Sequence, residues 1–171
     1  NLFDKIDVPL IREHPDTGEI IPGLAEAWAE HQGMLWFRLN PSARYSNGRP
    51  VRAGDFALGA CLREQAGDTV LGSVVVELHT YGDNVLAVKL RKEGFQPLLK
   101  ATMVLHPAEP SFYAEFGPDY KKRYQDRVPP TTGAYTVGKV QRGRLITLVR
   151  NKSWWAKDLP GFRYTCNADS I

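Results

Sequence analysis

An alternating sequence pattern near the end of the chain strongly restricts the structure that this segment can adopt. An alternating run of side chains opens at Gly133, residues 141–144 (Gln-Arg-Gly-Arg) turn the chain, and a second alternating run ends at Asn151. Alternation with a period of two places successive side chains on opposite faces of a strand, and a short glycine-containing link joins antiparallel neighbours. We therefore expect a β-hairpin, followed by the adjacent Trp154 and Trp155. No side chain in this segment is suited to covalent chemistry.

The rest of the chain divides into short elements. Its 15 glycines and 12 prolines recur throughout, which favours short elements over long helices. Together with the final hairpin, the predicted elements indicate an α+β fold, a mixed and largely antiparallel sheet flanked by short helices. The elements are a strand over 36–39, a helix over 53–65, a second hairpin over 74–79 and 85–90, and short helices over 95–102, 111–116 and 119–125.

The predicted helix 53–65 has a weakened start. Arg52 occupies the N-cap position, where a hydroxyl side chain would accept a backbone hydrogen bond, while Asp55 keeps the acidic position of a capping box. Because arginine has no hydroxyl to accept this bond, the start of the helix is expected to be about 1 kcal/mol less stable than with serine or threonine at the N-cap. Gly54 in the first turn weakens the helix further.

The second strand of the second hairpin predicts one buried and one solvated face. Leu86, Val88 and Leu90 alternate with Ala87 and Lys89. This alternation is typical of an antiparallel strand with its apolar side on the core.

Size and charge limit the classes of function. At 171 residues the chain is long enough to bury one core, and its net charge is only +3. The basic clusters are residues 121–123, flanked by Asp119 and Asp126, and the pair Arg142 and Arg144. A nucleic-acid surface needs many cations on one face, so we interpret both clusters as solvated surface of mixed charge. No apolar run is long enough to cross a bilayer.

The sequence shows no catalytic or metal-binding constellation. The histidines are scattered, and no two have the spacing of metal ligands on one helix face. Asp68 and Asp83 are predicted in loops, where carboxylates are usually solvated or form Asx-turns. We therefore expect no enzyme, no metal and no cofactor, although a triad assembled only in three dimensions stays open. The histidines are His14, His31, His79 and His106.

The two cysteines are read as free thiols. Cys61 lies with Leu58 and Leu62 on an apolar helical stripe, which predicts a buried thiol acting as a small hydrophobe. A Cys61–Cys166 disulfide would close a long loop and fit an oxidising compartment, but two free thiols are favoured.

The four tryptophans are numerous for this length and raise the question of a cargo cleft. Trp36 lies between apolar strand residues and Trp28 ends an apolar turn, so we expect both in the core. Of Trp154 and Trp155, at least one is expected to be buried against the sheet. None is assigned as a ligand contact.

Four blocks of sequence resemble one family. Residues 2–6, 16–28, 36–51 and 131–155 are similar, in this order, to segments of the family 5 extracytoplasmic solute-binding proteins, which feed peptides, nickel and similar cargo to ABC transporters. The last block is the most specific. Thr-Thr-Gly-Ala-Tyr resembles the family's Gly-Thr-Gly-Pro-Tyr turn, and Arg-Asn followed by a tryptophan pair resembles the end of its next strand.

The resemblance implies lobe I of a two-lobed periplasmic binding protein that closes on cargo by hinge motion. Residues 1–171 are expected to form a single partial domain, a first-lobe segment with the second lobe absent. The family's cargo-charge partners lie in that other part, so the ligand-binding residues stay unknown. The implied function is capture of peptides or similar small solutes for import through an ABC permease, in the periplasm or outside the cell, soluble or lipid-anchored. The start at Asn1 without a leader fits a removed signal peptide or a trimmed chain.

Two other functions stay open at this point. Some regulators carry a solute-binding module of this family fused to a DNA-binding segment, which would make the chain a solute-sensing domain. A hydrolase with a dispersed site is the third reading.

Overall fold

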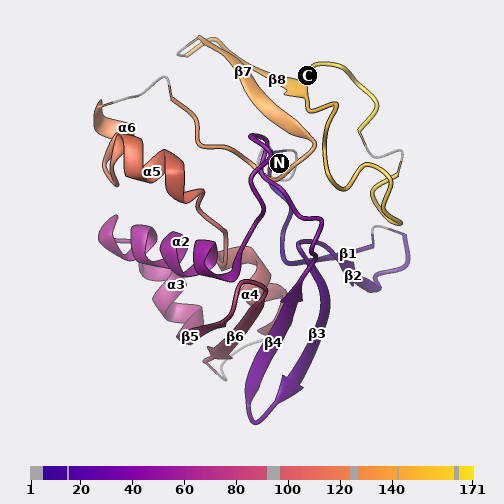
Figure 1. Ribbon diagram of the computed structural model, residues 1–171, viewed down its shortest axis with the longest axis vertical. Helices are drawn as coiled ribbons and strands as arrows, with labels where there is room; N and C mark the ends of the chain where they lie inside the picture. Colours follow the sequence, from indigo (N-terminus) through magenta and orange to yellow (C-terminus); the bar gives the residue numbers. More distant parts are fainter. Residues whose placement is uncertain (1–5, 15, 92–96, 124–126, 142, 164–165) are drawn as a thin grey trace. The chain divides into compact units, whose positions relative to one another are not determined.

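The strands pair in antiparallel sheets, as the alternating sequences predict, and short helices connect them (Figure 1). The computed structural model describes residues 6–14, 16–91, 97–123, 127–141, 143–163 and 166–171. Two units make up the chain. The first unit contains Asn1–Val8, Ser42–Pro50 and Glu109–Ile171, and the second contains Pro9–Pro41 and Val51–Ala108.

The second unit is built on a four-stranded sheet in the order β3-β4-β6-β5, with every neighbour antiparallel. The expected strand 36–39 and the expected hairpin over 74–90 are confirmed within it. A smaller two-stranded sheet, which the sequence did not indicate, pairs β1 with β2. The strands are β1 (Ile11–Glu13), β2 (Ile20–Pro22), β3 (Ala25–His31), β4 (Met34–Leu39), β5 (Val75–Tyr81) and β6 (Val85–Leu90).

Strand β6 is buried more completely than its alternation predicts. Leu86 and Val88 are fully buried as expected, but Ala87, expected on a wet face, is also 0% exposed. The small side chain of Ala87 is registered between Trp36 of β4 and His79 of β5, and these larger neighbours cover it. The expectation of an exposed Ala87 is therefore wrong, because central strands are shielded on both edges.

Helix α2 (Ala53–Gln65) has the predicted bounds. Arg52 supplies no side-chain cap, whereas its backbone N–H donates to Asp55 Oδ2 at 2.9 Å, so half of a capping box is present. The buried face differs from the predicted stripe. Phe56 and Gly59 are buried and Cys61 is exposed. The helix packs with its Gly59 side against the loop after α4, because only glycine allows so close an approach. A Cβ at this position would lie 2.1 Å from the carbonyl oxygen of His106.

The remaining helices of the second unit are α3 (Thr69–Val74) and α4 (Pro97–Val104). Asp68 begins α3 by accepting a hydrogen bond from the Val70 N–H at 2.8 Å, which confirms the expected Asx-type role of this loop carboxylate. Helix α4 confirms the expected helix from Pro97 onward, while residues 95 and 96 lie outside the described residues.

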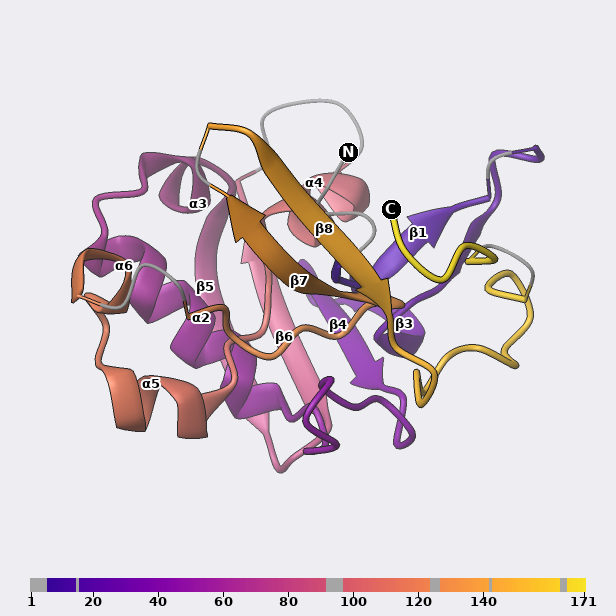
Figure 2. The same cartoon turned by 90° about the horizontal axis from the view of Figure 1, so that it is seen from above.

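The first unit contains the C-terminal hairpin, β7 (Tyr135–Gln141) paired with β8 (Leu145–Arg150), as predicted (Figure 2). Its helices are α5 (Pro110–Phe116) and α6 (Tyr120–Arg123). Gly117 ends α5 with a φ of 78°, a conformation that favours glycine. The predicted helix 119–125 is confirmed over α6, and residues 124–126 lie outside the described part of the chain.

Candidate functional site

The segment after β8 turns back onto the start of the hairpin. The Asn151 N–H donates to the Ala134 carbonyl at 2.7 Å, and the Trp154 N–H donates to the Asn151 carbonyl at 3.0 Å. Both indole N–H groups, of Trp154 and Trp155, donate to the carbonyl oxygen of Thr132 at 3.0 Å. Trp154 is 5% exposed, so the expectation that one tryptophan of the pair is buried is confirmed. The two tryptophans thus hold the turn at Thr132 in place, and both indole N–H groups already have a hydrogen-bond acceptor.

Thr132 fixes the same turn to the N-terminal segment. Its Oγ1 accepts a hydrogen bond from the Val8 N–H at 3.0 Å, and its N–H donates to Asp7 Oδ1 at 3.1 Å. At Gly133 the backbones approach so closely that a Cβ would lie 2.4 Å from the carbonyl carbon of Ile6. Glycine at this position therefore follows from the close approach of the two backbones.

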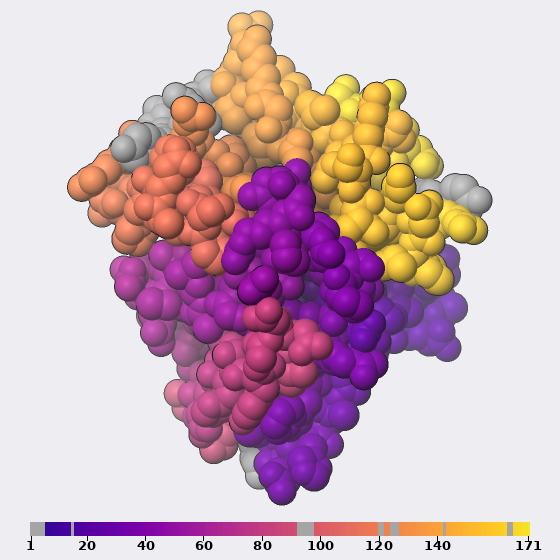
Figure 3. Space-filling view, in the orientation of Figure 1, coloured from indigo at the N-terminus to yellow at the C-terminus, as the bar shows by residue number. Residues whose placement is uncertain are grey.

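A cleft of about 180 Å³ opens beside this turn within the first unit. We call it the basic pocket. Figure 3 shows the C-terminal segment that forms part of its wall, in yellow, at the molecular surface. Among the described residues that line it, three are cationic, none is acidic, and the apolar wall is aromatic. Those that carry the argument are Arg150, Lys152, Lys157, Trp154, Phe162 and Cys166.

The lining of the basic pocket brings one thiol and three cationic side chains together. Its thiol, Cys166, has no histidine among the described lining residues to act as a base. Arg150 pairs with Asp169, with 2.6 Å between Nη2 and Oδ1, and the Asp169 side chain is 78% exposed. Within the described residues, Arg150 Nε is the buried side-chain nitrogen without a hydrogen-bond partner.

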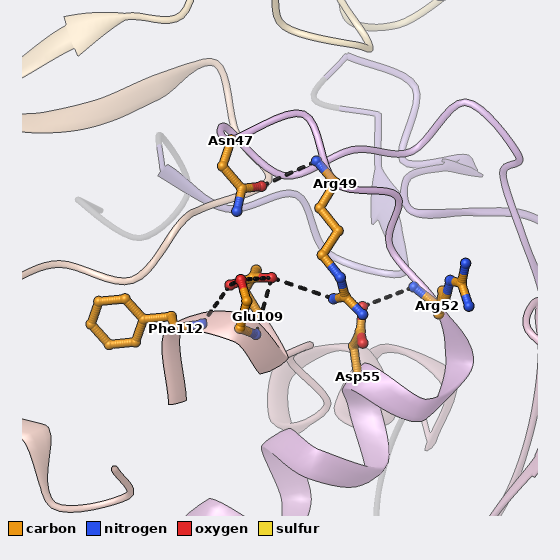
Figure 4. A network of polar contacts seen from close by, with 7 residues as sticks. Asn47, Arg49, Arg52, Asp55, Glu109 and Phe112 are labelled. Carbon is orange, nitrogen blue, oxygen red and sulfur yellow. Dashed lines mark hydrogen bonds and ion pairs between the residues drawn. The ribbon is translucent and has the colours of Figure 1, made fainter. Parts of the chain in front are cut away.

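A second polar centre of the first unit surrounds the carboxylate of Glu109 (Figure 4). Glu109 is 1% exposed and caps α5, accepting hydrogen bonds from the Phe112 N–H at 2.8 Å and from Ser111 Oγ at 2.8 Å. Arg49 Nη1 lies 3.5 Å from its Oε1. Burial raises the pKa of Glu109, but the Ser111 and Phe112 hydrogen bonds and the Arg49 charge outweigh it and hold the pKa below its ordinary value.

Sequence reasoning missed this centre. Glu109 and Arg49 are 60 positions apart, and no local pattern indicates that they meet. The N-cap of α5 could have been predicted from the sequence Glu-Pro-Ser, in which a side chain that can accept hydrogen bonds precedes a proline at the first position of the helix. The ion pair links the segment around Arg49 to the segment that leads into α5.

The four histidines lie in separate parts of the fold. His31 ends β3, His79 lies in β5, and His14 and His106 lie in loops. The described residues hold no cluster of histidine, cysteine or carboxylate side chains that could bind a metal ion. Asp83 pairs with Arg52 at 3.2 Å, at the surface.

The expectations for Trp28, Trp36 and Cys61 are wrong in part. Trp28 and Trp36 are half-buried on β3 and β4. Phe37 takes the core position on β4, and Trp36 stacks on Tyr81 with ring centroids 5.2 Å apart. Trp28 lies on β3, an edge strand of the sheet. Cys61 faces solvent, on the side of α2 opposite Phe56. Both cysteines are free, as favoured.

The basic cluster at 121–123 shows the expected mixed charge, since Arg123 pairs with Asp119 at 3.3 Å. Asp126 and Arg142 lie outside the described residues. In the described part of the chain no helix is both long and apolar enough for a membrane span.

Known proteins match nearly the whole chain. Residues 19–167 match the profile of the family described as bacterial extracellular solute-binding proteins, family 5 Middle. A putative binding protein of Brucella melitensis is 27% identical and the peptidoglycan-binding protein YepA of Agrobacterium fabrum is 25% identical, each over 95% of this chain. The chain spans 27% of the length of each of these relatives.

Solved structures share the fold. The substrate-binding domain of an oligopeptide ABC transporter from Bacillus anthracis superposes on 99% of this chain with a TM-score of 0.78 and 18% identity. The match covers 35% of that domain. The arrangement of short helices and antiparallel sheets is therefore the fold of a piece of a substrate-binding protein.

Proposed function

The chain belongs to family 5 of the bacterial extracellular solute-binding proteins, and we propose that it forms the first-lobe part of a longer protein that captures peptides or similar small solutes for an ABC permease. Residues 1–171 are assigned to that lobe as one partial domain, with the two units as its parts, and the second lobe lies outside them. In this proposal the protein works in the periplasm or outside the cell, and it binds its solute without reacting with it.

One observation carries the proposal: the family profile spans residues 19–167, and a transporter's substrate-binding domain shares the fold over 99% of the chain. Peptide cargo is favoured because that domain serves an oligopeptide transporter and the relative YepA is described as peptidoglycan-binding. The same comparison supports an ABC permease as the partner.

A first-lobe segment is expected to supply only half of the cargo site, and the cleft of its first unit is smaller than a complete peptide site. The basic pocket measures about 180 Å³, whereas pockets that enclose drug-sized ligands start at about 300 Å³. Tight capture of a peptide requires most of its surface to leave water, which two closing lobes achieve together. A first-lobe segment alone is therefore expected to bind peptide cargo weakly.

Isothermal titration calorimetry tests this directly. A mixed peptide library is titrated into the 171-residue chain and, separately, into the longer protein that carries it. Negligible heat with the chain and clear binding with the longer protein are expected. Tight binding of peptides by the chain alone would refute the half-site, and no binding by either protein would refute peptide cargo.

A further inference from the structure

We propose that the basic pocket of the first unit binds a carboxylate group, which Arg150, Lys152 and Lys157 hold against the aromatic wall formed by Trp154 and Phe162. The inference does not depend on the transport role, because it rests on the charges and geometry of this pocket alone.

The charge in the pocket is unbalanced. Lys152 and Lys157 are exposed, and neither has an ion-pair partner within the described residues. The only described carboxylate paired with a lining cation is that of Asp169, on Arg150. Two unneutralised ammonium groups beside one guanidinium attract an anion, and a partly enclosed cleft strengthens that attraction over open water.

Arg150 already shows which anion its guanidinium accepts. Its Nη2 donates a short, charge-assisted hydrogen bond of 2.6 Å to the Asp169 carboxylate. Because Asp169 is 78% exposed, its carboxylate can turn into water at little cost when another takes its place. A small rotation of the guanidinium toward the pocket would also give Arg150 Nε a partner, which it lacks now.

The aromatic wall of the pocket is already packed in the absence of a ligand. Trp154 and Phe162 pack edge to face, with ring centroids 5.3 Å apart and planes at 89°, and both are 5% exposed. The Trp154 indole N–H is fixed on Thr132. A preformed wall reduces the ordering that binding would otherwise require.

The volume of about 180 Å³ admits a small organic acid or the carboxylate end of a larger solute. These two sources share the same recognised group. An amide of the same shape lacks the charge and should bind poorly, so the neutral amide is the matched comparison.

The test is an NMR titration of the 171-residue chain with succinate and, separately, with succinamide. Succinate should shift the signals of the Trp154 indole and of neighbouring amides in a saturable way that weakens as salt is added, and succinamide should not. The double variant Lys152→Gln, Lys157→Gln should bind succinate about tenfold more weakly, since partly exposed ion pairs contribute up to about fivefold each. Both lysines are exposed, so the variant should fold, and its amide spectrum shows whether it does.

Lys122→Gln removes an exposed lysine elsewhere in the first unit and should leave the affinity unchanged. A second pair of probes, trialanine with a free and with an amidated C-terminus, identifies the source of the carboxylate. Tighter binding of free trialanine than of succinate indicates a larger solute, and the reverse indicates a small acid. Equal binding of succinate and succinamide, no saturable shift at millimolar succinate, or an unchanged affinity in the folded double variant would each overturn the proposal.

Discussion

The buried carboxylate of Glu109 is the polar group whose removal should affect the first unit most. Glu109→Ala takes away the acceptor for the Phe112 N–H and the Ser111 hydroxyl and the partner of Arg49. Glu109→Gln keeps the shape and one acceptor oxygen but removes the charge. The two variants therefore separate the capping hydrogen bonds from the ion pair.

The expected magnitudes follow from burial. Loss of a cap costs about 1 kcal/mol, and a buried donor left without a partner costs about 1–3 kcal/mol more. Arg49 is 31% exposed, so water can solvate its guanidinium when Glu109 is removed. The total loss of unfolding free energy is therefore expected to stay below the range for breaking a fully buried ion pair. We expect Glu109→Ala to lower the free energy of unfolding by about 2–4 kcal/mol and Glu109→Gln by about 1–2 kcal/mol.

The loss of unfolding free energy caused by Glu109→Gln should depend on pH. Because the folded-state pKa of Glu109 lies below its ordinary value, its charge stabilises the fold fully above the unfolded-state pKa. That contribution disappears as the pH falls through the lower folded-state value. The gap between the wild-type chain and Glu109→Gln should therefore narrow below about pH 4.

Urea unfolding at several pH values, with hydrogen exchange at the Phe112 amide as a local probe, measures both effects. Glu115→Gln, an exposed carboxylate on the same helix, is the matched control and should change little at any pH. A gap in unfolding free energy between the wild-type chain and Glu109→Gln that stays constant from neutral to acid pH would refute the stabilising role of the Glu109 charge. Unchanged exchange at Phe112 in Glu109→Ala would refute the cap.

Three further outcomes are expected. Gly59→Ala should destabilise the second unit by about 2–3 kcal/mol, because the added Cβ would lie 2.1 Å from a backbone oxygen. Gly54→Ala, in open space on the same helix, should stabilise the unit by up to about 1 kcal/mol. Thermal unfolding compares the two variants, and equal effects on stability would contradict the packing described for Gly59. Thr132→Val should cost about 2 kcal/mol in urea unfolding, because the Val8 N–H loses its acceptor, and wild-type stability would show that this contact is dispensable. Ellman's reagent should titrate two thiols per native chain, the exposed Cys61 before the half-buried Cys166, and a count of zero would indicate a disulfide.

Local patterns predicted the elements that depend on local interactions. Helix α2 was predicted with its observed bounds, because an apolar repeat and a capping acid define it within thirteen residues. Two of the three long hairpins in the described part of the chain were predicted from alternation and turn residues. The third was missed, because strand β3, which pairs with β4, was taken for a turn that ends at Trp28. The short strands β1 and β2 were missed, since three residues are too few to show a period.

The features that the sequence could not show depend on distant parts of the chain. The buried face of α2 was misassigned because Gly59, which carries little apolar signal, meets the loop at His106. Ala87 is covered by side chains of two other strands. The basic pocket was missed for the same reason, because Arg150, Lys152 and Lys157 become neighbours only when the segment after β8 folds back.

Reversible capture, with the cargo left chemically intact, is the central claim. Native mass spectrometry of the longer protein, incubated with a defined library of short peptides, measures it most directly. We expect mass additions that equal intact library members and that disappear on dilution. Peptide fragments in the mixture, or a covalent addition that survives denaturation, would contradict the claim and indicate an enzyme.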